Sequence, residues 1–438
     1  MSAELLIRNA RVWPSARSAV IEDGSVLVRD GRIAKIGSFR ARAKTVIDAD
    51  GCLVMPGFVQ SHVHLCQTIF RGAAEDMPLL PWLRDYIWPL EAAHDSESIR
   101  TSALLACAEL IRGGTTAFLS METVRHTDTV FQAVAETGLM AIIGHCLMDD
   151  SCGYAPLAVD IDDAIADCDI LLEHFGLGEN IRLAVAPRFA LSCATPSLKK
   201  AAEYARDRGL LLHTHSSEQA DEVELVKRRT GQWNIHYLDS VGMTGPDCCL
   251  AHCVHTRPDE RSVLRDTGTK VLHCPSANMK LGSGIAPVPE YLEDGISVSI
   301  GSDGAACNNR LDAFLEMREA ALLQKIRLGP QALPARDVVA MATEGGAHAL
   351  GWHREMGTLE PGKRANIILV DQRDFSVLPS ADPATNLVYS NCSRDVVMTI
   401  VNGQILFENG QLATIDGEKL KADVNAQRKK LFERAGLA

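Results

Sequence analysis

Short apolar runs alternate with longer stretches of helical periodicity through the middle of the chain. Residues 197–209 and 311–326 show the helical pattern most clearly. Alternating strands and helices predict a parallel sheet, and eight such units over about 300 residues predict a closed (β/α)8 TIM-type barrel. An open doubly wound sheet is the alternative, and the lack of a glycine-rich phosphate turn after the first run favours the barrel. The eight runs cover residues 53–64, 114–121, 139–145, 181–189, 209–218, 247–255, 269–277 and 296–304.

Both ends of the chain have a strand-like rhythm instead. Short apolar alternations broken by Asp-Gly and Asn-Gly turns fill residues 4–57 and return at 365–412. They predict one small β-sandwich built from the N- and C-terminal segments. The expected domains are therefore residues 1–56 and 357–438 for the sandwich, around a barrel at 57–356. Residues 417–436 predict an amphipathic C-terminal helix.

Composition and charge narrow the function classes. The 438 residues include 44 basic and 56 acidic side chains, a net charge of −12 that argues against nucleic-acid binding. No apolar run approaches the roughly 20 residues of a membrane span, and the first residues do not resemble a signal peptide. The thirteen cysteines are scattered without paired spacing, which is typical of reduced thiols. We expect a cytoplasmic protein without a membrane or nucleic-acid partner.

Polar side chains stand at the carboxyl ends of the eight runs. In a barrel the C-terminal ends of the strands share one mouth, so residues distant in sequence converge there. His62 and His64 lie two positions apart, so both can face the barrel axis. The residues expected at this mouth are His62, His64, Arg188, His215, His252, His273 and Asp303.

The histidine pair indicates a metal site only when further potential ligands accompany it. Two hydrogen-bonded core histidines would explain His62 and His64 by themselves. A third histidine and Asp303 complete a set of three nitrogens and one oxygen, which suits zinc or another borderline divalent ion. Strand parity leaves His213 and His215 both open as the third ligand. A structural zinc would use closely spaced cysteines, so the set predicts a catalytic centre.

The order of the motifs resembles the amidohydrolase superfamily, within its branch of aminohydrolases that deaminate purines, pterins and triazines. The resemblance covers nearly the whole chain, and the motifs are specific as a set. They are PGFVQSHVH (56–64), HTHSSE (213–218), AHCVH (251–255), HCPSANMKLGSGIAPVPE (273–290), GSDGAACNN (301–309) and GTLEPGKRANIILVD (357–371).

Carried over by position, the resemblance implies one divalent ion, zinc or else iron(II) or manganese(II). Superfamily members with two ions use a lysine on the fourth strand, and residues 181–189 contain none. Glu218 corresponds to the proton shuttle, and His252 to the residue that orients the attacked group and the activated water. His273 corresponds to a position that is not a ligand. Asp303 would also accept the proton of the water that attacks the amino-bearing ring carbon. The implied metal ligands are His62, His64, His215 and Asp303.

Residues 80–91, 278–290 and 301–309 are similar to deaminases of 5′-deoxyadenosine, methylthioadenosine and S-adenosylhomocysteine. In these enzymes the counterpart of Trp82 packs near the nucleoside. The counterpart of Glu91 accepts hydrogen bonds from the ribose diol, for which a carboxylate offers two acceptors. The resemblance implies that a 6-aminopurine nucleoside is converted to its inosine analogue and ammonia.

Two departures from the S-adenosylhomocysteine pattern concern the 5′ group. The S-adenosylhomocysteine deaminases have an arginine where this chain has His145. They have a second arginine within the stretch that matches residues 149–160, which contain no arginine here. The missing arginines would hold the amino-acid tail, so their absence favours a small, uncharged 5′ substituent.

Other features keep alternatives open. Gln67 and Arg188 match residues with which guanine deaminases hold their base, although Arg188 could instead form a salt bridge at the rim. Cys307 could touch the substrate or simply pack. Hydrolysis of amino- or chloro-s-triazines would use the same centre. A non-enzymatic assembly protein would lack the ligands that are complete here. The expected partners are a small heterocyclic amine and, as in relatives, further copies of the chain.

Overall fold

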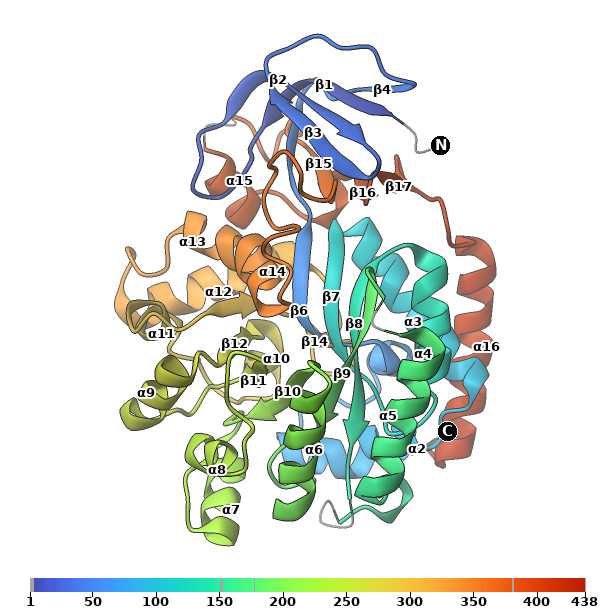
Figure 1. The fold of residues 1–438 in the computed structure, drawn as a ribbon, viewed down its shortest axis with the longest axis vertical. Helices are drawn as coiled ribbons and strands as arrows, with labels where there is room; N and C mark the ends of the chain where they lie inside the picture. Colours follow the sequence, from blue (N-terminus) through green and yellow to red (C-terminus); the bar gives the residue numbers. More distant parts are fainter. Residues whose placement is uncertain (1–3, 150–152, 177, 380–381, 438) are drawn as a thin grey trace.

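The computed structural model describes residues 4–149, 153–176, 178–379 and 382–437 and has two parts (Figure 1). A small β domain formed by both ends of the chain lies at one end of a barrel ringed by helices. The chain enters the barrel directly from the terminal sheet, because one residue separates β5 (Cys52–Pro56) from β6 (Phe58–His64).

The parallel strands of the barrel confirm the predicted (β/α)8 architecture. The sheet runs β13-β12-β11-β10-β9-β8-β7-β6-β14. The eighth apolar run supplies both end members: Val298 of β13 pairs with Val271 of β12, and Asp303 of β14 pairs with Val63 of β6. This last run therefore joins the seventh strand to the first. The remaining strands are β7 (Thr115–Met121), β8 (Met140–Leu147), β9 (Ile181–Pro187), β10 (Leu211–Ser216), β11 (Cys248–His252), β12 (Lys270–His273), β13 (Val298–Ile300) and β14 (Asp303–Gly304).

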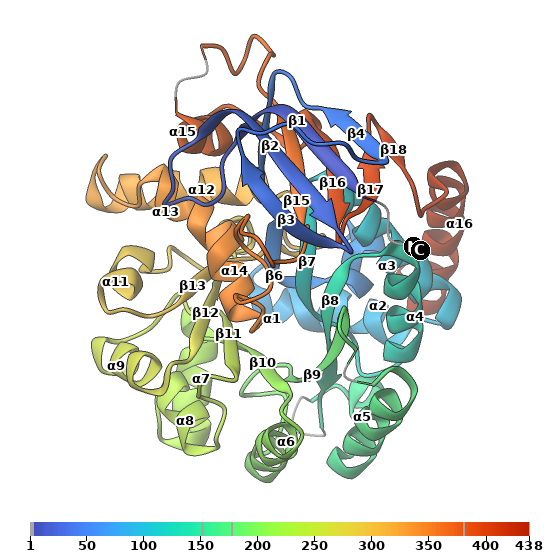
Figure 2. The same cartoon turned by 45° about the horizontal axis from the view of Figure 1, so that its top comes forward.

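Helices between the strands surround the sheet (Figure 2). Their starts carry ordinary caps: the Asp95 side chain accepts from Ser98 N before α3, and Asp312 accepts from Phe314 N before α12. The helices expected at residues 197–209 and 311–326 are observed as α6 and α12. The helices up to that point are α1 (Leu79–Trp82), α2 (Trp88–Ala92), α3 (Ser96–Arg112), α4 (Thr127–Thr137), α5 (Ile161–Phe175), α6 (Thr195–Asp207), α7 (Ala220–Thr230), α8 (Asn234–Ser240), α9 (Pro258–Thr267), α10 (Pro275–Lys280), α11 (Val288–Glu293) and α12 (Ala313–Leu328).

The terminal segments form the predicted β domain around a core of their own. Its strands follow the order β18-β17-β16-β15-β5-β1-β2-β3, with β4 on β1. Ile7, Val26, Val54 and Ile367 come from both ends of the chain and share this core. The strands are β1 (Leu5–Val12), β2 (Ile21–Arg29), β3 (Arg32–Gly37), β4 (Thr45–Asp48), β15 (Ile367–Asp371), β16 (Val396–Val401), β17 (Gln404–Glu408) and β18 (Gln411–Leu412).

The last helix, α16 (Gly417–Ala435), lies along α3 on the outside of the barrel (Figure 1). Two of its arginines reach into the segment that follows the first barrel strand. Arg428 donates to the carbonyl of Ile69 at 2.8 Å, and Arg434 donates to that of Ala93 at 2.8 Å. The C-terminal helix thus braces the segment that contains α1 and α2. The other helices near this end are α13 (Ala335–Ala340), α14 (Gly346–Ala349) and α15 (Pro383–Tyr389).

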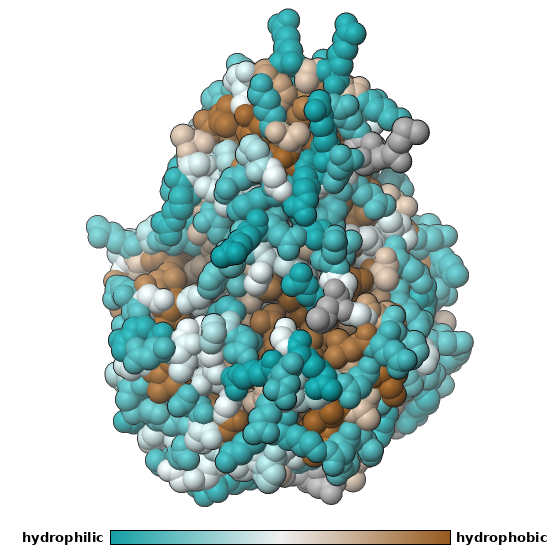
Figure 3. All heavy atoms as spheres, viewed as in Figure 1, coloured by the Kyte–Doolittle hydropathy of each residue, from teal (hydrophilic) through white to brown (hydrophobic). Residues whose placement is uncertain are grey.

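The surface in Figure 3 is mainly hydrophilic, with small hydrophobic areas scattered between charged side chains. Within the described ranges, no helix combines the length and the apolar character that a membrane crossing requires.

A phenylalanine pair tests the packing of the barrel. Phe118 on β7 is fully buried, whereas Phe375 is 95% exposed. We expect Phe118→Ala to lower the free energy of unfolding by about 3–5 kcal/mol, because it removes buried surface and leaves a cavity. Phe375→Ala should change it by less than about 0.5 kcal/mol. Guanidinium unfolding followed by circular dichroism measures both, and equal midpoints for the two variants would contradict the packing.

Candidate active site

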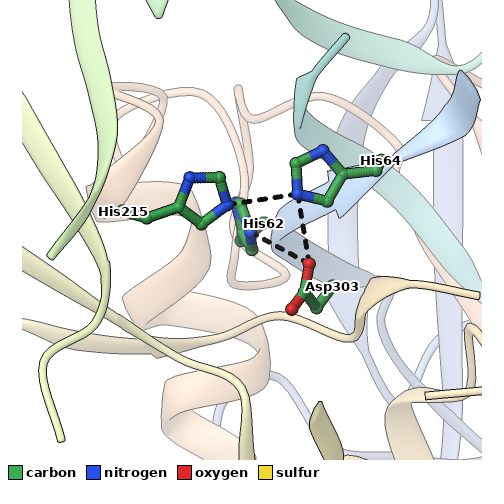
Figure 4. Close-up of side chains that lie close together, drawn as sticks. All are labelled: His62, His64, His215 and Asp303. Atoms are coloured by element: carbon green, nitrogen blue, oxygen red, sulfur yellow. Dashed lines mark hydrogen bonds and ion pairs between the residues drawn. The ribbon is translucent and has the colours of Figure 1, made fainter. Parts of the chain in front are cut away.

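Four side chains from three barrel strands meet at the mouth of the barrel (Figure 4). His62 Nε2 and His64 Nε2 lie 3.3 and 3.2 Å from Asp303 Oδ1. His215 Nε2 lies 3.2 Å from His64 Nε2. All four side chains are buried, and their potential ligand atoms lie within 4.8 Å of one another. The structure thus brings together the predicted ligand set.

The outer nitrogen of each histidine is held by a second group. His64 Nδ1 donates to the carbonyl of Met121 at 2.7 Å, and His215 Nδ1 donates to that of Arg188 at 2.6 Å. His62 Nδ1 lies 2.9 Å from His213 Nε2. The two carbonyl acceptors assign the proton of His64 and His215 to Nδ1 and leave each of their Nε2 lone pairs facing the centre, as in histidines that bind metals. His213 is therefore the buried support of His62.

The turn that carries Asp303 is shaped by close backbone contacts. Asp303 adopts φ +60°, a left-handed conformation that is uncommon outside glycine. A Cβ at Gly301 would lie 2.6 Å from the carbonyl oxygen of His62, and one at Gly304 would lie 2.2 Å from Gln67 Oε1. Glycine at these two positions lets the turn approach β6 and places the carboxylate beside both histidines.

The protonation states favour ligation. Burial lowers the pKa of His62 to about 4 and that of His215 well below its usual value, so both rings are neutral at pH 7. Burial alone would raise the pKa of Asp303, but the adjacent imidazoles of His62 and His64 bring it well below its ordinary range. Burial also opposes a charge on His64, but its contact with Asp303 outweighs burial and raises the pKa of His64. Neutral imidazoles and an ionised carboxylate are the forms that bind metals, so an ion would bind in competition with a proton on His64.

The donor set fits a divalent ion. Buried polar atoms normally have hydrogen-bond partners. His62 Nε2 is buried without one, although it points at the other three donors. Three imidazole nitrogens and one carboxylate oxygen suit zinc and other borderline ions. The residues therefore match a mononuclear centre of the catalytic type.

Glu218 and His252 form a second layer beside these four residues. His252 Nε2 lies 3.6 Å from Glu218 Oε2 and 3.8 Å from Asp303 Oδ2. His252 Nδ1 lies 2.9 Å from Asn278 Oδ1, which assigns its proton to Nδ1 and leaves Nε2 toward the site. Burial, followed by the charges of Asp303 and Glu222, raises the pKa of Glu218 well above its usual value. Such a carboxyl group can hold a proton near neutral pH.

A small cavity opens above this centre. Glu218, His252 and Asp303 form part of its polar floor, and Trp82 and Phe189 belong to its apolar wall. The mix of apolar walls and a few polar groups is typical of sites for small organic ligands. The full lining is His64, Gln67, Leu79, Trp82, Leu83, Arg188, Phe189, His215, Glu218, Glu222, His252, Leu281 and Asp303.

A buried charged network flanks the cavity. Arg188 donates to Glu91 Oε2 at 2.5 Å and to Oε1 at 3.2 Å, and Gln67 Nε2 donates to Oε1 at 2.9 Å. Arg188 and Gln67 line the cavity, while Glu91 lies behind them on α2. Because the pair is bidentate and nearly inaccessible to water, each charge compensates the other. The rim salt bridge considered for Arg188 is therefore a buried one.

Three other candidate residues lie outside the cavity lining. The Cys307 thiol donates to the carbonyl of Gly304 at 3.2 Å, so a contact with substrate stays a prediction. His145 hydrogen-bonds to Thr127 Oγ1 and lines a separate hollow between α4 and α5. His273 is fully buried, and its two ring nitrogens have no hydrogen-bond partner in the described part of the chain. Residues 150–152 of the stretch without arginines lie outside the described residues.

Sequence reasoning missed several residues of the site. Phe189 and Leu281 line the cavity, and Gln219 bridges its mouth by accepting from Leu79 N and donating to the carbonyl of Leu281. Glu222 also reaches the cavity. Phe189 could have been inferred from its place after the Arg188 strand end. Leu281 and Gln219 carry no sequence signal of their own.

Comparisons with known proteins agree with this geometry. The model of the amidohydrolase family matches residues 53–406. A 5′-deoxyadenosine deaminase from Methanothermobacter thermautotrophicus is 42% identical over 401 residues, which are 90% of this chain and 92% of the relative. A 5-methylthioadenosine/S-adenosylhomocysteine deaminase from Moorella thermoacetica is 38% identical over 435 residues, covering 98% of this chain and 99% of the relative.

A solved structure has the same fold throughout. The crystal structure of an adenosine deaminase from Xanthomonas campestris with bound zinc superposes with a TM-score of 0.93 at 29% identity. The match covers 98% of this chain and 99% of that one. With the family model extending over most of the chain and relatives this similar over nearly their full length, the protein belongs to the amidohydrolase family.

Proposed function

We propose that the protein is a metal-dependent deaminase of 5′-modified adenosines, which converts the 6-amino group to a carbonyl and releases ammonia. The observation that carries the proposal is the cluster of three histidines and Asp303 beneath a cavity with aromatic and polar lining residues, with Glu218 and His252 beside it. The names of the relatives support an adenosine derivative as the substrate class.

Asp303 and Glu218 carry out the proton transfers, and His252 orients the reactants. A divalent ion, when bound by His62, His64, His215 and Asp303, supplies the Lewis acidity that brings the pKa of water near neutrality. Asp303 accepts a proton from the attacking water. His252, fixed by Asn278, orients the attacked carbon and the water through Nε2. Glu218 donates its proton to the adjacent ring nitrogen and then assists the leaving ammonia. Water and the amine thus become a carbonyl and ammonia.

The cavity walls suit a nucleoside. Trp82 offers an aromatic face for the purine or ribose. We infer that Arg188 and Gln67 donate to acceptors of the purine and that Glu91 receives the ribose hydroxyls, which requires it to exchange part of its present hydrogen bonds. A contact from Cys307 would reach the substrate only after a shift of the Gly304 turn.

The charge of the cavity favours a small, neutral 5′ group. Among the described lining residues, Arg188 is the one arginine or lysine, and Glu91 already compensates it. A substrate with an amino-acid tail would bring a carboxylate without a free cation to meet it. Leaving that carboxylate unpaired in a buried site is costly. We infer that 5′-deoxyadenosine and methylthioadenosine are preferred over S-adenosylhomocysteine.

Zinc, a cytoplasmic location and a homo-oligomer complete the proposal. The nitrogen-rich donor set supports zinc, with iron(II) or manganese(II) as alternatives. Free thiols at buried cysteines such as Cys66, Cys107 and Cys249 support a reducing compartment. Leu322 and Ile326 are exposed one turn apart on α12, which supports a contact with another copy.

Ammonia release from a panel of substrates tests the proposed function. With zinc-loaded protein, we expect the highest kcat/KM for 5′-deoxyadenosine and methylthioadenosine. S-adenosylhomocysteine should be at least about tenfold poorer, because its carboxylate is not matched. Guanine and a chlorinated s-triazine serve as the contrasting substrates. Turnover of guanine alone would assign Gln67 and Arg188 to a guanine site, and chloride release would assign a triazine hydrolase.

Glu218→Gln tests the proton shuttle. The amide retains the size of the side chain but cannot carry the proton, so kcat should fall by at least about 100-fold while the metal content stays unchanged. Glu224→Gln, on the exposed side of α7, is the matched control and should retain full activity. The comparison requires steady-state kinetics and elemental analysis of both variants. Near-normal turnover by Glu218→Gln would refute the shuttle.

Removal of the metal should abolish activity reversibly. Dialysis against a chelator takes away the Lewis acid and also lowers Tm, since an ion bound only by the folded state stabilises that state. One equivalent of zinc per chain should restore both properties, because the four donors form one site. Calorimetry with increasing zinc measures the stoichiometry. Full turnover by protein shown to be metal-free would contradict the role of the cluster.

A further inference from the structure

A second buried carboxylate lies directly behind the proposed proton shuttle. Glu222, on the first turn of α7, is 1% exposed. Its Oε2 accepts from the backbone N–H of Glu218 at 2.7 Å, and its Oε1 accepts from Asn234 Nδ2 at 2.7 Å. The carboxylate therefore connects the residue that carries the shuttle to α8.

The geometry differs from that of an ordinary helix cap. In a capping box, the third residue of the helix accepts from the N–H of the capping residue. Here that bond, from Gln219 N, is 3.4 Å long, whereas the bond from Glu218 N is 2.7 Å. The stronger contact thus holds the shuttle and not the cap. A capping role alone does not explain it.

The other side of the same turn is fastened to the end of β11. Ser217 has φ +52°, and its carbonyl accepts from Val254 N and His255 N at 2.9 Å each. These two residues follow shortly after His252. The turn that presents Glu218 is therefore held between the Glu222 carboxylate and the backbone that continues from His252. A non-glycine residue keeps such a φ value only where its surroundings enforce it.

We propose that Glu222 is a positioning residue, which fixes the Glu218 carboxyl against His252 and the reacting ring nitrogen by anchoring the Glu218 backbone. The proposal rests on the shuttle role given to Glu218. Glu218 Oε2 already lies 3.6 Å from His252 Nε2, so a small rotation of the turn would carry the carboxyl away from its partner. A misplacement of about 1 Å at a catalytic group can cost about 100-fold in rate.

The experiment compares alanine and glutamine at position 222 in the zinc-loaded protein. We expect Glu222→Ala to lower kcat about 10- to 100-fold, with KM within about twofold and the zinc content unchanged. Glu222→Gln retains an acceptor for Glu218 N, so kcat should recover to within about fivefold of the unmodified protein. Glu224→Ala, on the exposed face of the same helix, is the control for helix propensity.

The outcomes separate positioning from general stability. A kcat for Glu222→Ala equal to that of Glu224→Ala would overturn the proposal, and so would a glutamine variant as slow as the alanine variant. If Glu222→Ala fails to fold, Asn234→Ala replaces it, because it removes the support of Oε1 and keeps the Glu222 carboxylate. A several-fold lower kcat at constant KM and zinc content is then expected, and an unchanged kcat would overturn the proposal.

The same assays separate a failure of the positioning role of Glu222 from a failure of the shuttle role of Glu218. An inactive Glu218→Gln variant together with a fully active Glu222→Ala variant defeats the positioning role and leaves the proposed function intact. A fully active Glu218→Gln variant removes the shuttle itself, and the positioning role falls with it.

Discussion

The site depends on the short pairing between β14 and β6. Asp303 pairs with Val63 and Gly304 with His64, so the last strand segment lies directly against the first. This pairing closes the ring of strands and in the same step places the carboxylate beside both histidines of β6. It is possible because Gly301 and Gly304 lack a Cβ at the points of closest approach. Barrel closure and assembly of the proposed metal ligands are therefore one structural event.

The burial of so many ionisable groups is tolerated because each is matched to a partner. Moving an isolated charge into the interior costs several kcal/mol, and a close, hydrogen-bonded counter-group offsets much of that cost. Glu91 is matched by Arg188, and Glu222 by Asn234 and backbone N–H groups. Glu218 is the exception, since Asp303 and Glu222 both raise its pKa further. The surroundings of Glu218 thus favour the protonated form that the proposed mechanism requires.

The sequence predicts those features that local residue patterns encode, and it does not predict contacts between residues that are distant along the chain. The barrel, the β domain and the ligands were accessible because strand alternation and the HxH spacing are local patterns, and the common barrel mouth supplies the remaining proximity. The Arg188–Glu91 bond joins residues 97 positions apart, and no local pattern encodes it. His145 stands where the S-adenosylhomocysteine group has an arginine, and its hydrogen bond to Thr127 away from the cavity lining was not accessible from the sequence.

Chemistry and substrate recognition come from different parts of the molecule. The metal ligands stand on strands, whose positions the barrel fixes, whereas Leu79, Trp82 and Leu83 belong to the segment after β6. That segment is held by Gln219 at its inner end and braced by α16 on the outside. Changes in these connections can reshape the cavity without disturbing the strand ends. The proposed metal ligands and the apolar cavity wall are therefore held by separate sets of contacts, so the wall can change while the strand ends stay in place.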